Sequence, residues 1–171
     1  MTVKKFRWFL ASNIEKEEAW LTEMSAKGLH FRKNRFGLYY FDEDSEKSYM
    51  YQIDFQRNID KAYLQFYRDA GWEPVDEYMR TFHYFRHDTA GPPAEKLYSD
   101  TESMRESYRR MMNFYIMIFA MMILLSIPNF LVWQDLIIQK IAVGLVFLAL
   151  ILYIFLFVGL RRKIKSFHYK Q

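Results

Sequence analysis

Residues 141–160 form the stretch that most constrains the fold, because they read IAVGLVFLALILYIFLFVGL without a charged or amide side chain. Twenty residues of helix span about 30 Å, the thickness of a bilayer's hydrocarbon core. A helix that is apolar on every side is buried in a soluble protein only when that protein is large, and about 90 residues of small domain are too few. We therefore expect a transmembrane helix at 141–160.

A second apolar stretch, 111–133, also lacks charged side chains, although it contains Asn113, Ser126 and Pro128. The proline predicts a kink or an end of the helix, and Trp133 stands where an interfacial aromatic anchor is expected. A short loop separates the two stretches, so we expect an antiparallel transmembrane hairpin. One span plus an interfacial helix is the alternative.

The basic residues near the two stretches predict their orientation. Nine flank the outer ends of the hairpin and one, Lys140, lies in its loop, so the positive-inside rule places both termini in the cytoplasm of a multi-pass cell-membrane protein. The nine are Lys96, Arg105, Arg109, Arg110, Arg161, Arg162, Lys163, Lys165 and Lys170. We expect no cleavable signal, because the apolar stretch near the N-terminus is too short.

The net charge of +4 comes from the basic tail 161–171, which carries +5, while the rest of the chain sums to −1. We interpret the tail as a stop-transfer and lipid-headgroup anchor, with a specific anionic-lipid site as the alternative. A nucleic-acid protein would carry its positive charge on the folded domain, so DNA is not an expected partner.

Residues 1–90, called the head below, show alternating strand and helix patterns. Ser12 and Glu15 have the spacing of a capping box, and Gly28 is a helix stop. The cleanest alternation is in 49–56, where Asp54 lies on the polar face. The predicted strands are 5–10, 29–41, 49–56 and 72–75 with 78–87, and the predicted helices are 13–27 and 60–70.

The order β-α-β-β-α-β predicts an α+β, ferredoxin-like domain with one antiparallel sheet. A faint internal repeat supports two similar halves, because Gly28-Leu29 recurs as Gly71-Trp72 after 43 residues and Tyr40-Phe41 recurs as Tyr84-Phe85 after 44. Residues 91–110 are then a linker and juxtamembrane helix, with Ser99 and Glu102 as its capping box. A frayed linker is the alternative.

Few residues suggest chemistry. The chain has no cysteine, hence neither disulfides nor a thiol nucleophile. His83 and His87 are four apart in a strand, where that spacing separates them by about 13 Å, too far for a metal pair. A cross-strand partner such as Arg7 is expected for Asp54, rather than catalysis. We find no phosphate-binding loop or nucleophile elbow, and we expect neither an enzyme nor a cofactor.

The aromatic residues, 19% of the chain, favour core and sheet packing in a small domain. The alternative is RNA binding, because residues 35–41 (RFGLYYF) loosely resemble the base-stacking motif of RNA-recognition modules. A near-neutral head opposes that interpretation, as does the position of this segment in the second predicted strand, since those modules use the third.

Several segments resemble one family in order and spacing. They are Lys5-Phe6-Arg7-Trp8-Phe9, Glu18-Ala19-Trp20-Leu21, Met24-Ser25-Ala26-Lys27-Gly28, Tyr51-Gln52-Ile53-Asp54-Phe55, Asp69-Ala70-Gly71-Trp72-Glu73 and His83-Tyr84-Phe85-Arg86. The chain is similar over nearly its whole length to the bacterial membrane proteins grouped as domain of unknown function 2812. This resemblance implies a cytoplasmic domain on a membrane hairpin and genomic association with PadR-like transcriptional regulators. It implies no reaction.

The leading hypothesis is a non-enzymatic, membrane-anchored regulatory or accessory protein whose cytoplasmic head binds a protein partner or small ligand. The first alternative is a small subunit of a membrane transport complex, whose hairpin packs against other helices through Asn113, Ser126 and Gly144 or Gly159. The second alternative is a membrane-tethered RNA-binding module.

Overall fold

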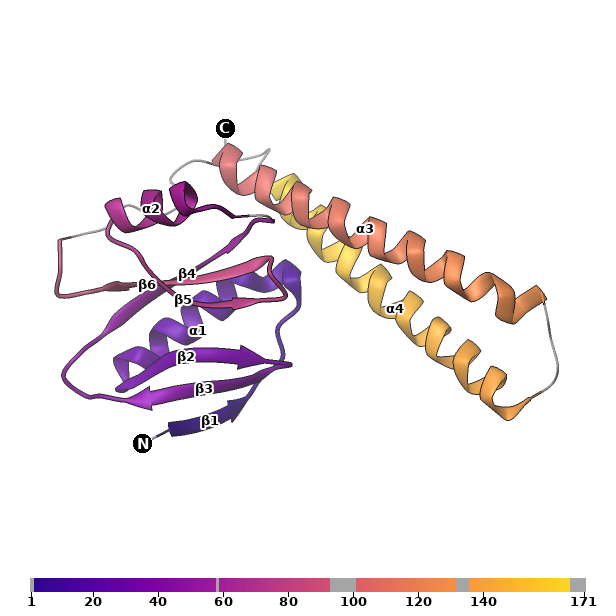
Figure 1. Ribbon diagram of the computed structural model, residues 1–171, viewed down its shortest axis with the longest axis horizontal. Helices are drawn as coiled ribbons and strands as arrows, with labels where there is room; N and C mark the ends of the chain where they lie inside the picture. The colour runs from indigo at the N-terminus through magenta and orange to yellow at the C-terminus, as the bar shows by residue number, and fades with distance from the viewer. Residues whose placement is uncertain (1, 58, 93–100, 132–135, 167–171) are drawn as a thin grey trace. The chain divides into compact units, whose positions relative to one another are not determined.

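The computed structural model describes residues 2–57, 59–92, 101–131 and 136–166 (Figure 1). They belong to two compact units, residues 1–107 and residues 108–171, and each unit is described here by itself. The first unit is the predicted α+β domain, and the second consists of apolar helices. The predicted Ser99 cap, the anchor Trp133 and the tail end 167–171 lie outside the described residues.

The first half of the head is a strand, a helix and a hairpin on one antiparallel sheet. Strand β3 lies in the middle, in the order β1-β3-β2, with Val3 opposite Phe41 and Phe31 opposite the same residue on the other side. Its elements are β1 (Thr2–Phe6), a 3₁₀ turn (Ala11–Asn13), α1 (Ile14–Ala26), β2 (Leu29–Arg35) and β3 (Leu38–Glu43).

The second half repeats this arrangement. Strand β6 lies in the middle of a second antiparallel sheet in the order β4-β6-β5, with Ile53 opposite Tyr84 and Gln52 opposite Phe85. Helix α2 begins at an Asp60 cap, whose carboxylate accepts a 2.7 Å hydrogen bond from the Tyr63 N–H. The elements are β4 (Tyr49–Phe55), α2 (Lys61–Asp69), β5 (Glu73–Tyr78) and β6 (Phe82–Asp88).

The prediction of one antiparallel sheet is therefore wrong, since the head has two three-stranded sheets. The predicted strand 29–41 is broken at Phe36 and Gly37, whose φ angles of +53° and +78° turn the chain into a hairpin. The second hairpin turns at Met79 and Arg80, also with positive φ. Arg35 pairs with Leu38, but Tyr78 pairs with Phe82. The one extra residue in the second turn explains why the repeat offset changes from 43 to 44.

Strand β4 does not join the first sheet, because helix α1 covers its free edge. Backbone N–H groups of alternate β4 residues donate to side chains on one face of α1. The bonds run from Ile53 to Glu18, Tyr51 to Thr22 and Tyr49 to Ser25, at 2.8, 3.1 and 2.8 Å. An uncovered edge strand would present these groups to another strand. Helix α1 thus holds the two halves together.

The N-terminus of α1 differs from the prediction. The expected capping box of Ser12 and Glu15 is not formed, because a 3₁₀ turn at Ala11–Asn13 precedes the helix and Asn13 takes the cap position without a side-chain hydrogen bond. The C-terminal stop at Gly28 is confirmed, with φ at +77° and a 2.9 Å bond from its N–H to the Ser25 carbonyl.

Aromatic side chains fill two cores, as the composition predicted. Between α1 and the first sheet, the Trp20 ring is nearly perpendicular to the rings of Tyr39 and Phe41, with ring centroids 4.9 and 5.6 Å apart. Between α2 and the second sheet, the buried core consists of Tyr67, Trp72 and Phe85. Offset and edge-to-face ring pairs of this kind stabilise small domains beyond their buried area.

The second unit contains most of α3 (Thr101–Leu131) and all of α4 (Ile137–Ser166). Both are long and apolar enough to span a membrane, over Met104–Pro128 and Ile137–Lys165. Helix α3 passes Pro128 and ends at Leu131, three residues beyond the proline. The two helices contact each other through Phe119, whose ring lies 5.2 Å from Tyr153 and 5.9 Å from Phe157.

Candidate functional site

The edge strands β2 and β5 of the two sheets lie side by side, and their junction is the candidate site. Each strand carries a bulge at the equivalent place, between Phe31 and Lys33 in β2 and between Pro74 and Asp76 in β5. A bulge leaves one residue out of the ladder and bends its strand. A hydrogen bond from Asn34 to Asp76 joins the strands at one end of the junction, and residues of both strands line a cleft at the other end, called the parted end below.

At the parted end lies a cleft of about 320 Å³, a size at the lower limit of ligand sites. Its charged lining has both signs. Arg86 donates to Glu73 at 2.8 Å and lies 4.5 Å from the Tyr49 ring centre, and Arg32 lies 3.8 Å from Asp42. The Glu73 carboxylate raises the pKa of Arg86 against the opposing effect of burial. Such a lining suits a polar ligand with both an acidic and a basic group.

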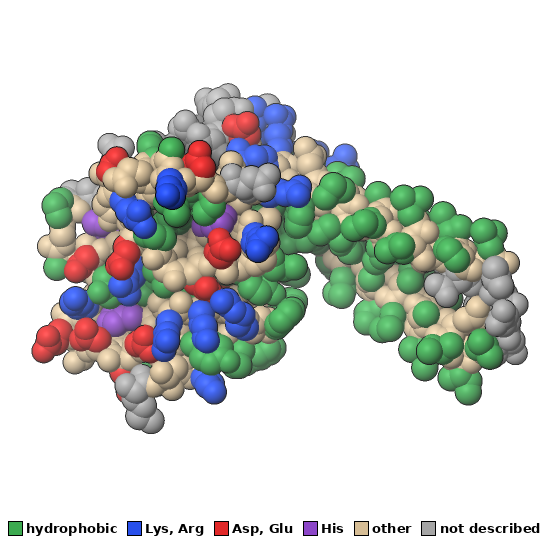
Figure 2. Space-filling view, in the orientation of Figure 1, with side chains coloured by type: hydrophobic (Ala, Val, Ile, Leu, Met, Phe, Trp, Pro, Cys, Tyr) green, Lys and Arg blue, Asp and Glu red, His purple; other side chains and the backbone are tan. Residues whose placement is uncertain are grey.

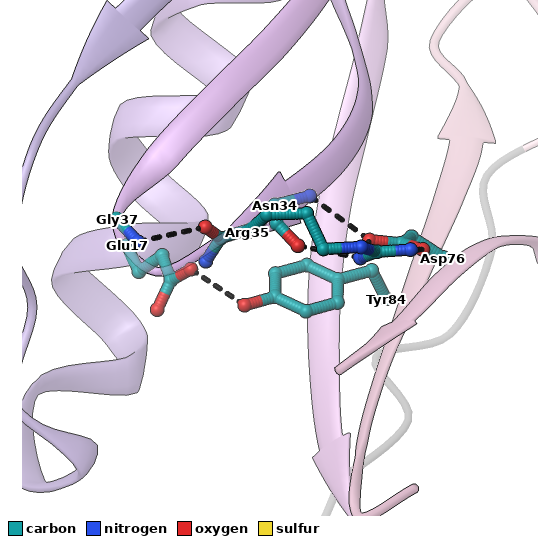
Figure 3. A network of polar contacts seen from close by, with 6 residues as sticks. All are labelled: Glu17, Asn34, Arg35, Gly37, Asp76 and Tyr84. Carbon is teal, nitrogen blue, oxygen red and sulfur yellow. Dashed lines mark hydrogen bonds and ion pairs between the residues drawn. The ribbon is translucent and has the colours of Figure 1, made fainter. Parts of the chain in front are cut away.

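At the bonded end, a polar network joins the strands (Figure 3). The Asn34 N–H of β2 donates to Asp76 of β5 at 2.9 Å, and the Arg35 guanidinium donates to the same carboxylate at 3.0 Å. The Asn34 side-chain oxygen accepts a 3.1 Å bond from the Gly37 N–H. One asparagine thus fixes both the strand junction and the β2–β3 turn.

Behind this network lies the buried carboxylate of Glu17 in α1 (Figure 3). It accepts hydrogen bonds from Tyr39 of β3 at 2.6 Å and from Tyr84 of β6 at 2.8 Å. Burial raises the pKa of Glu17, while both tyrosine bonds lower it. In turn, burial and the carboxylate raise the pKa of both phenols. The three groups connect the helix to both sheets.

The two hairpin turns expose large apolar side chains. Phe36 is 75% exposed and Met79 is 65% exposed. Both residues have positive φ, a backbone conformation that is uncommon for bulky residues and costs free energy. The Phe36 ring lies 6.1 Å from the Tyr78 ring, so the two turns lie together. Phe6 and Trp8 adjoin the first turn, because both rings lie within 3.3 Å of the Cβ position at Gly37. We call Phe6, Trp8, Phe36 and Met79 the turn patch.

The outer face of the first sheet carries several basic side chains, with Asp42 paired with Arg32 toward one end. Lys4 and Lys33 flank Tyr40 across the strands, with their ammonium groups 5.5 and 4.8 Å from its ring centre. We call these three residues and Arg32 the basic face. Figure 2 shows Lys and Arg side chains over one part of this sheet, beside hydrophobic side chains at one edge, and Asp and Glu side chains toward its other end. The near-neutral head thus has an uneven distribution of charge.

The predicted pairing of Asp54 with Arg7 is wrong. Asp54 lies on the side of β4 that faces α2, where its carboxylate accepts hydrogen bonds from Tyr63 and Tyr67. Arg7 belongs to the other half, and its guanidinium lies about 5 Å from the rings of Phe9 and Trp20. The second carboxylate oxygen of Asp54 is buried without a hydrogen-bond partner among the described residues.

The histidines of the head hydrogen-bond to backbone carbonyls. His83 bonds to Gln56 at 2.9 Å and His87 to Gly71 at 2.8 Å, while His30 lies between Ser25 and the Asp44 carbonyl. Within the described parts of the chain, no three His, Asp or Glu side chains form a group that could hold a metal ion. These partners give the three rings a role in packing.

Most of the segment that resembles an RNA-binding motif is not in the second strand, which ends at Arg35. Leu38–Phe41 lies in β3, the third strand and the central one of its sheet. Tyr39 and Phe41 point into the core, 2% and 0% exposed. Only Tyr40 of the three rings is on the outer face.

Sequence reasoning missed Asn34, Arg35 and Asp76, because a single asparagine or aspartate in a strand is ordinary. Glu17 lies in the first turn of α1, where an acidic side chain is ordinary, so its position in the sequence does not mark it as buried. The β2–β3 turn could have been found from Gly37, since Asn34 three residues before it has the spacing of a side chain that closes a turn.

Comparison with protein families decides the relationship. The family described as Protein of unknown function (DUF2812) matches residues 13–120, more than half of the chain. The chain belongs to this family. The match includes all of the DUF2812 head from α1 onward and most of α3, so the Glu17 network lies inside it, as do the cleft and both turns. No curated protein and no solved structure matches the chain.

Proposed function

We propose that this DUF2812 protein is a non-enzymatic, membrane-anchored regulatory or accessory protein whose cytoplasmic head is a binding module. Its ligand is a small polar molecule or a polar segment of a protein partner, and a circuit with a PadR-like regulator is the setting. The observation that carries the proposal is the cleft at the β2–β5 junction. Its lining includes the ion pairs Arg86–Glu73 and Arg32–Asp42 and the aromatic ring of Tyr49.

Two structural features support a binding role. The network of Asn34, Arg35 and Asp76 fixes one end of the junction, so the cleft is preorganised and a ligand pays little ordering entropy. The buried ionisable side chains next to that network, Glu17 and Tyr84, are hydrogen-bonded to each other inside the core.

The anchor is tested first. Because the chain has no cysteine, single substitutions give unique labelling sites, and Lys16→Cys in α1 serves for the head. In right-side-out membrane vesicles, an impermeant maleimide should label this cysteine only after the vesicles are opened. Labelling of intact vesicles would contradict the cytoplasmic placement, and recovery of the protein without detergent would contradict the anchor.

Binding in the cleft is tested by photocrosslinking in cells. A photoreactive phenylalanine analogue at Val75, which lines the cleft, should give a discrete adduct. The same analogue at Glu23, an exposed position in α1, is the matched control. Arg86→Gln should abolish the adduct at position 75, since it removes the ion pair with Glu73. Equal crosslinking at both positions would contradict a specific cleft.

A further inference from the structure

We propose that the turn patch and the basic face dock the head on an anionic lipid surface. The proposal rests on the membrane anchor proposed above, but of the residues in the turn patch and the basic face only Arg32 also lines the cleft. The apolar side chains of the two turns insert at the boundary of headgroups and acyl chains, while the lysines and arginines beside them contact headgroup phosphates.

The exposed side chains are those that favour this boundary. Trp8 is 66% exposed and Phe6 72%, beside the more exposed Phe36. Aromatic rings are enriched at membrane interfaces, and peripheral proteins bury large apolar side chains there. At Phe36 the ring is presented on a backbone with positive φ, held by the Asn34 bond to Gly37. The fold thus holds an apolar side chain outward at a conformational cost.

Charge complementarity selects an anionic surface. Lys4 and Lys33 lie over the sheet face that continues from the patch, and Arg80 follows Met79 in the second turn. Two carboxylates lie near these side chains: Asp76 is paired with Arg35 and is nearly buried, and the exposed Asp42 is paired with Arg32, so Lys4 and Lys33 are the main cations of this face. Basic clusters beside apolar insertions are attracted to anionic lipids within about a Debye length, roughly 8 Å at physiological salt.

RNA fits this surface less well. Single-stranded nucleic acids stack on several rings exposed along a sheet face, whereas here Tyr40 is the outward ring of β3 and two lysines flank it. The most exposed rings, Phe36 and Phe6, are at the ends of strands rather than along the face. Insertion into a lipid surface needs exposed rings at the ends of the strands, whereas base stacking needs them along the face of the sheet.

The test uses the full chain in nanodiscs and one cysteine at a time. Met79→Cys places an environment-sensitive fluorophore in the second turn, and Phe66→Cys is the matched control, since both side chains are 65% exposed. Leu148→Cys in α4 reports on the anchor. The lipids are phosphatidylcholine alone or an equal mixture with phosphatidylglycerol, each with a nitroxide-labelled quencher lipid.

In anionic nanodiscs we expect quenching at position 79 to exceed that at position 66 by about twofold or more, because an inserted side chain lies among the acyl chains. It should fall to the control level in phosphatidylcholine alone and in the Lys4→Gln/Lys33→Gln variant. Phe36→Asn should also reduce it, and asparagine tolerates the positive φ at this position, so the turn is retained. Phe66→Asn, with the label at position 79, should leave the quenching unchanged.

Three results would overturn the proposal, and they are distinguishable. If position 148 is quenched while positions 79 and 66 are quenched equally and weakly, the head does not dock on lipid, but the membrane anchor stands. Absence of quenching at position 148 removes the anchor itself. A fluorescence change at position 79 on adding a short single-stranded RNA at low salt, without quenching by lipid, assigns the surface to nucleic acid.

Discussion

Tyr84 of β6 donates a 2.8 Å hydrogen bond to Glu17 of α1, so the second sheet is bonded to the helix of the first half across 67 residues of sequence. Tyr39 of the first sheet donates to the same carboxylate oxygen. The halves are also joined by the hydrogen bonds between α1 and β4 and by those of Asn34 and Arg35 to Asp76. The two tyrosine bonds give the relative position of the halves a directional constraint.

The first prediction concerns the strength of that constraint. Tyr84→Phe removes one of two donors to a buried carboxylate and should lower the free energy of unfolding by about 1–3 kcal/mol. Thermal unfolding of the full chain in detergent measures it, followed by fluorescence of the buried Trp20 and Trp72. Tyr40→Phe is the control, since that ring lies on the outer face, and it should leave the melting temperature nearly unchanged. Equal effects of the two variants would contradict the prediction.

The second prediction is a pH dependence from Glu17. Burial raises its pKa above the usual 4.5, so the folded state binds this proton more tightly than the unfolded chain does. The contribution to stability is therefore fully present below pH 4.5 and is lost as the pH rises through the folded pKa. Glu17→Gln cannot lose a proton. The difference in melting temperature between the Glu17→Gln variant and wild type should therefore increase in favour of the variant as the pH is raised from 4.5 to about 8.

Glu23 provides a control of opposite sign on the same helix. Its hydrogen bond to Lys27 lowers its pKa, so its contribution is present above pH 4.5 and is lost as the pH falls. The melting temperature of Glu23→Gln relative to wild type should therefore decrease as the pH is raised, whereas that of Glu17→Gln increases, and both variants should approach wild type at acid pH. Melting curves of Glu17→Gln and wild type that stay parallel across the whole range would disprove the assignment.

The third prediction concerns the β2–β3 turn. A methyl group at Gly37 would lie 3.0 Å from the Arg7 carbonyl, and the φ of +78° is unfavourable for any residue with a Cβ. Gly37→Ala should therefore destabilise the head by about 1–2 kcal/mol or more. Phe36→Asn should act in the opposite direction, since asparagine adopts positive φ more readily. Denaturant unfolding of both variants checks the signs, and a loss of stability in Phe36→Asn would contradict this account.

Much of the head could be predicted from its sequence, because local rules determine its elements. The alternation of apolar and polar residues predicted strand β4, and Gly28 predicted the end of α1. The aromatic composition predicted aromatic cores, which the head contains. The repeat offsets of 43 and 44 also had a structural basis, one residue added to the second turn. Family membership followed from short segments in the right order and is confirmed.

What could not be predicted depends on long-range contacts. Residues 29–41 are rich in aromatic side chains, and their division into two strands depended on Phe36 adopting a conformation that phenylalanine rarely takes. The number of sheets depended on which element covers the edge of β4, and α1 covers it through polar side chains. The Asp54 partner was missed for a similar reason, since its tyrosines come from a helix that packs on one side of the sheet.

The fourth prediction tests the cover of that edge. Glu18, Thr22 and Ser25 lie on one face of α1 and accept from alternate N–H groups of β4, which matches a helical spacing to a strand spacing. Thr22→Val keeps the shape of the side chain and removes the acceptor, leaving the Tyr51 N–H buried without a partner. The cost should be about 1–3 kcal/mol, and hydrogen exchange of β4 peptides should be faster. Thr22→Ser retains the hydroxyl and should exchange nearly as wild type. If the valine variant were as well protected as the serine variant, packing alone would hold α1 on this edge, and the polar ladder would have no part in separating the two sheets.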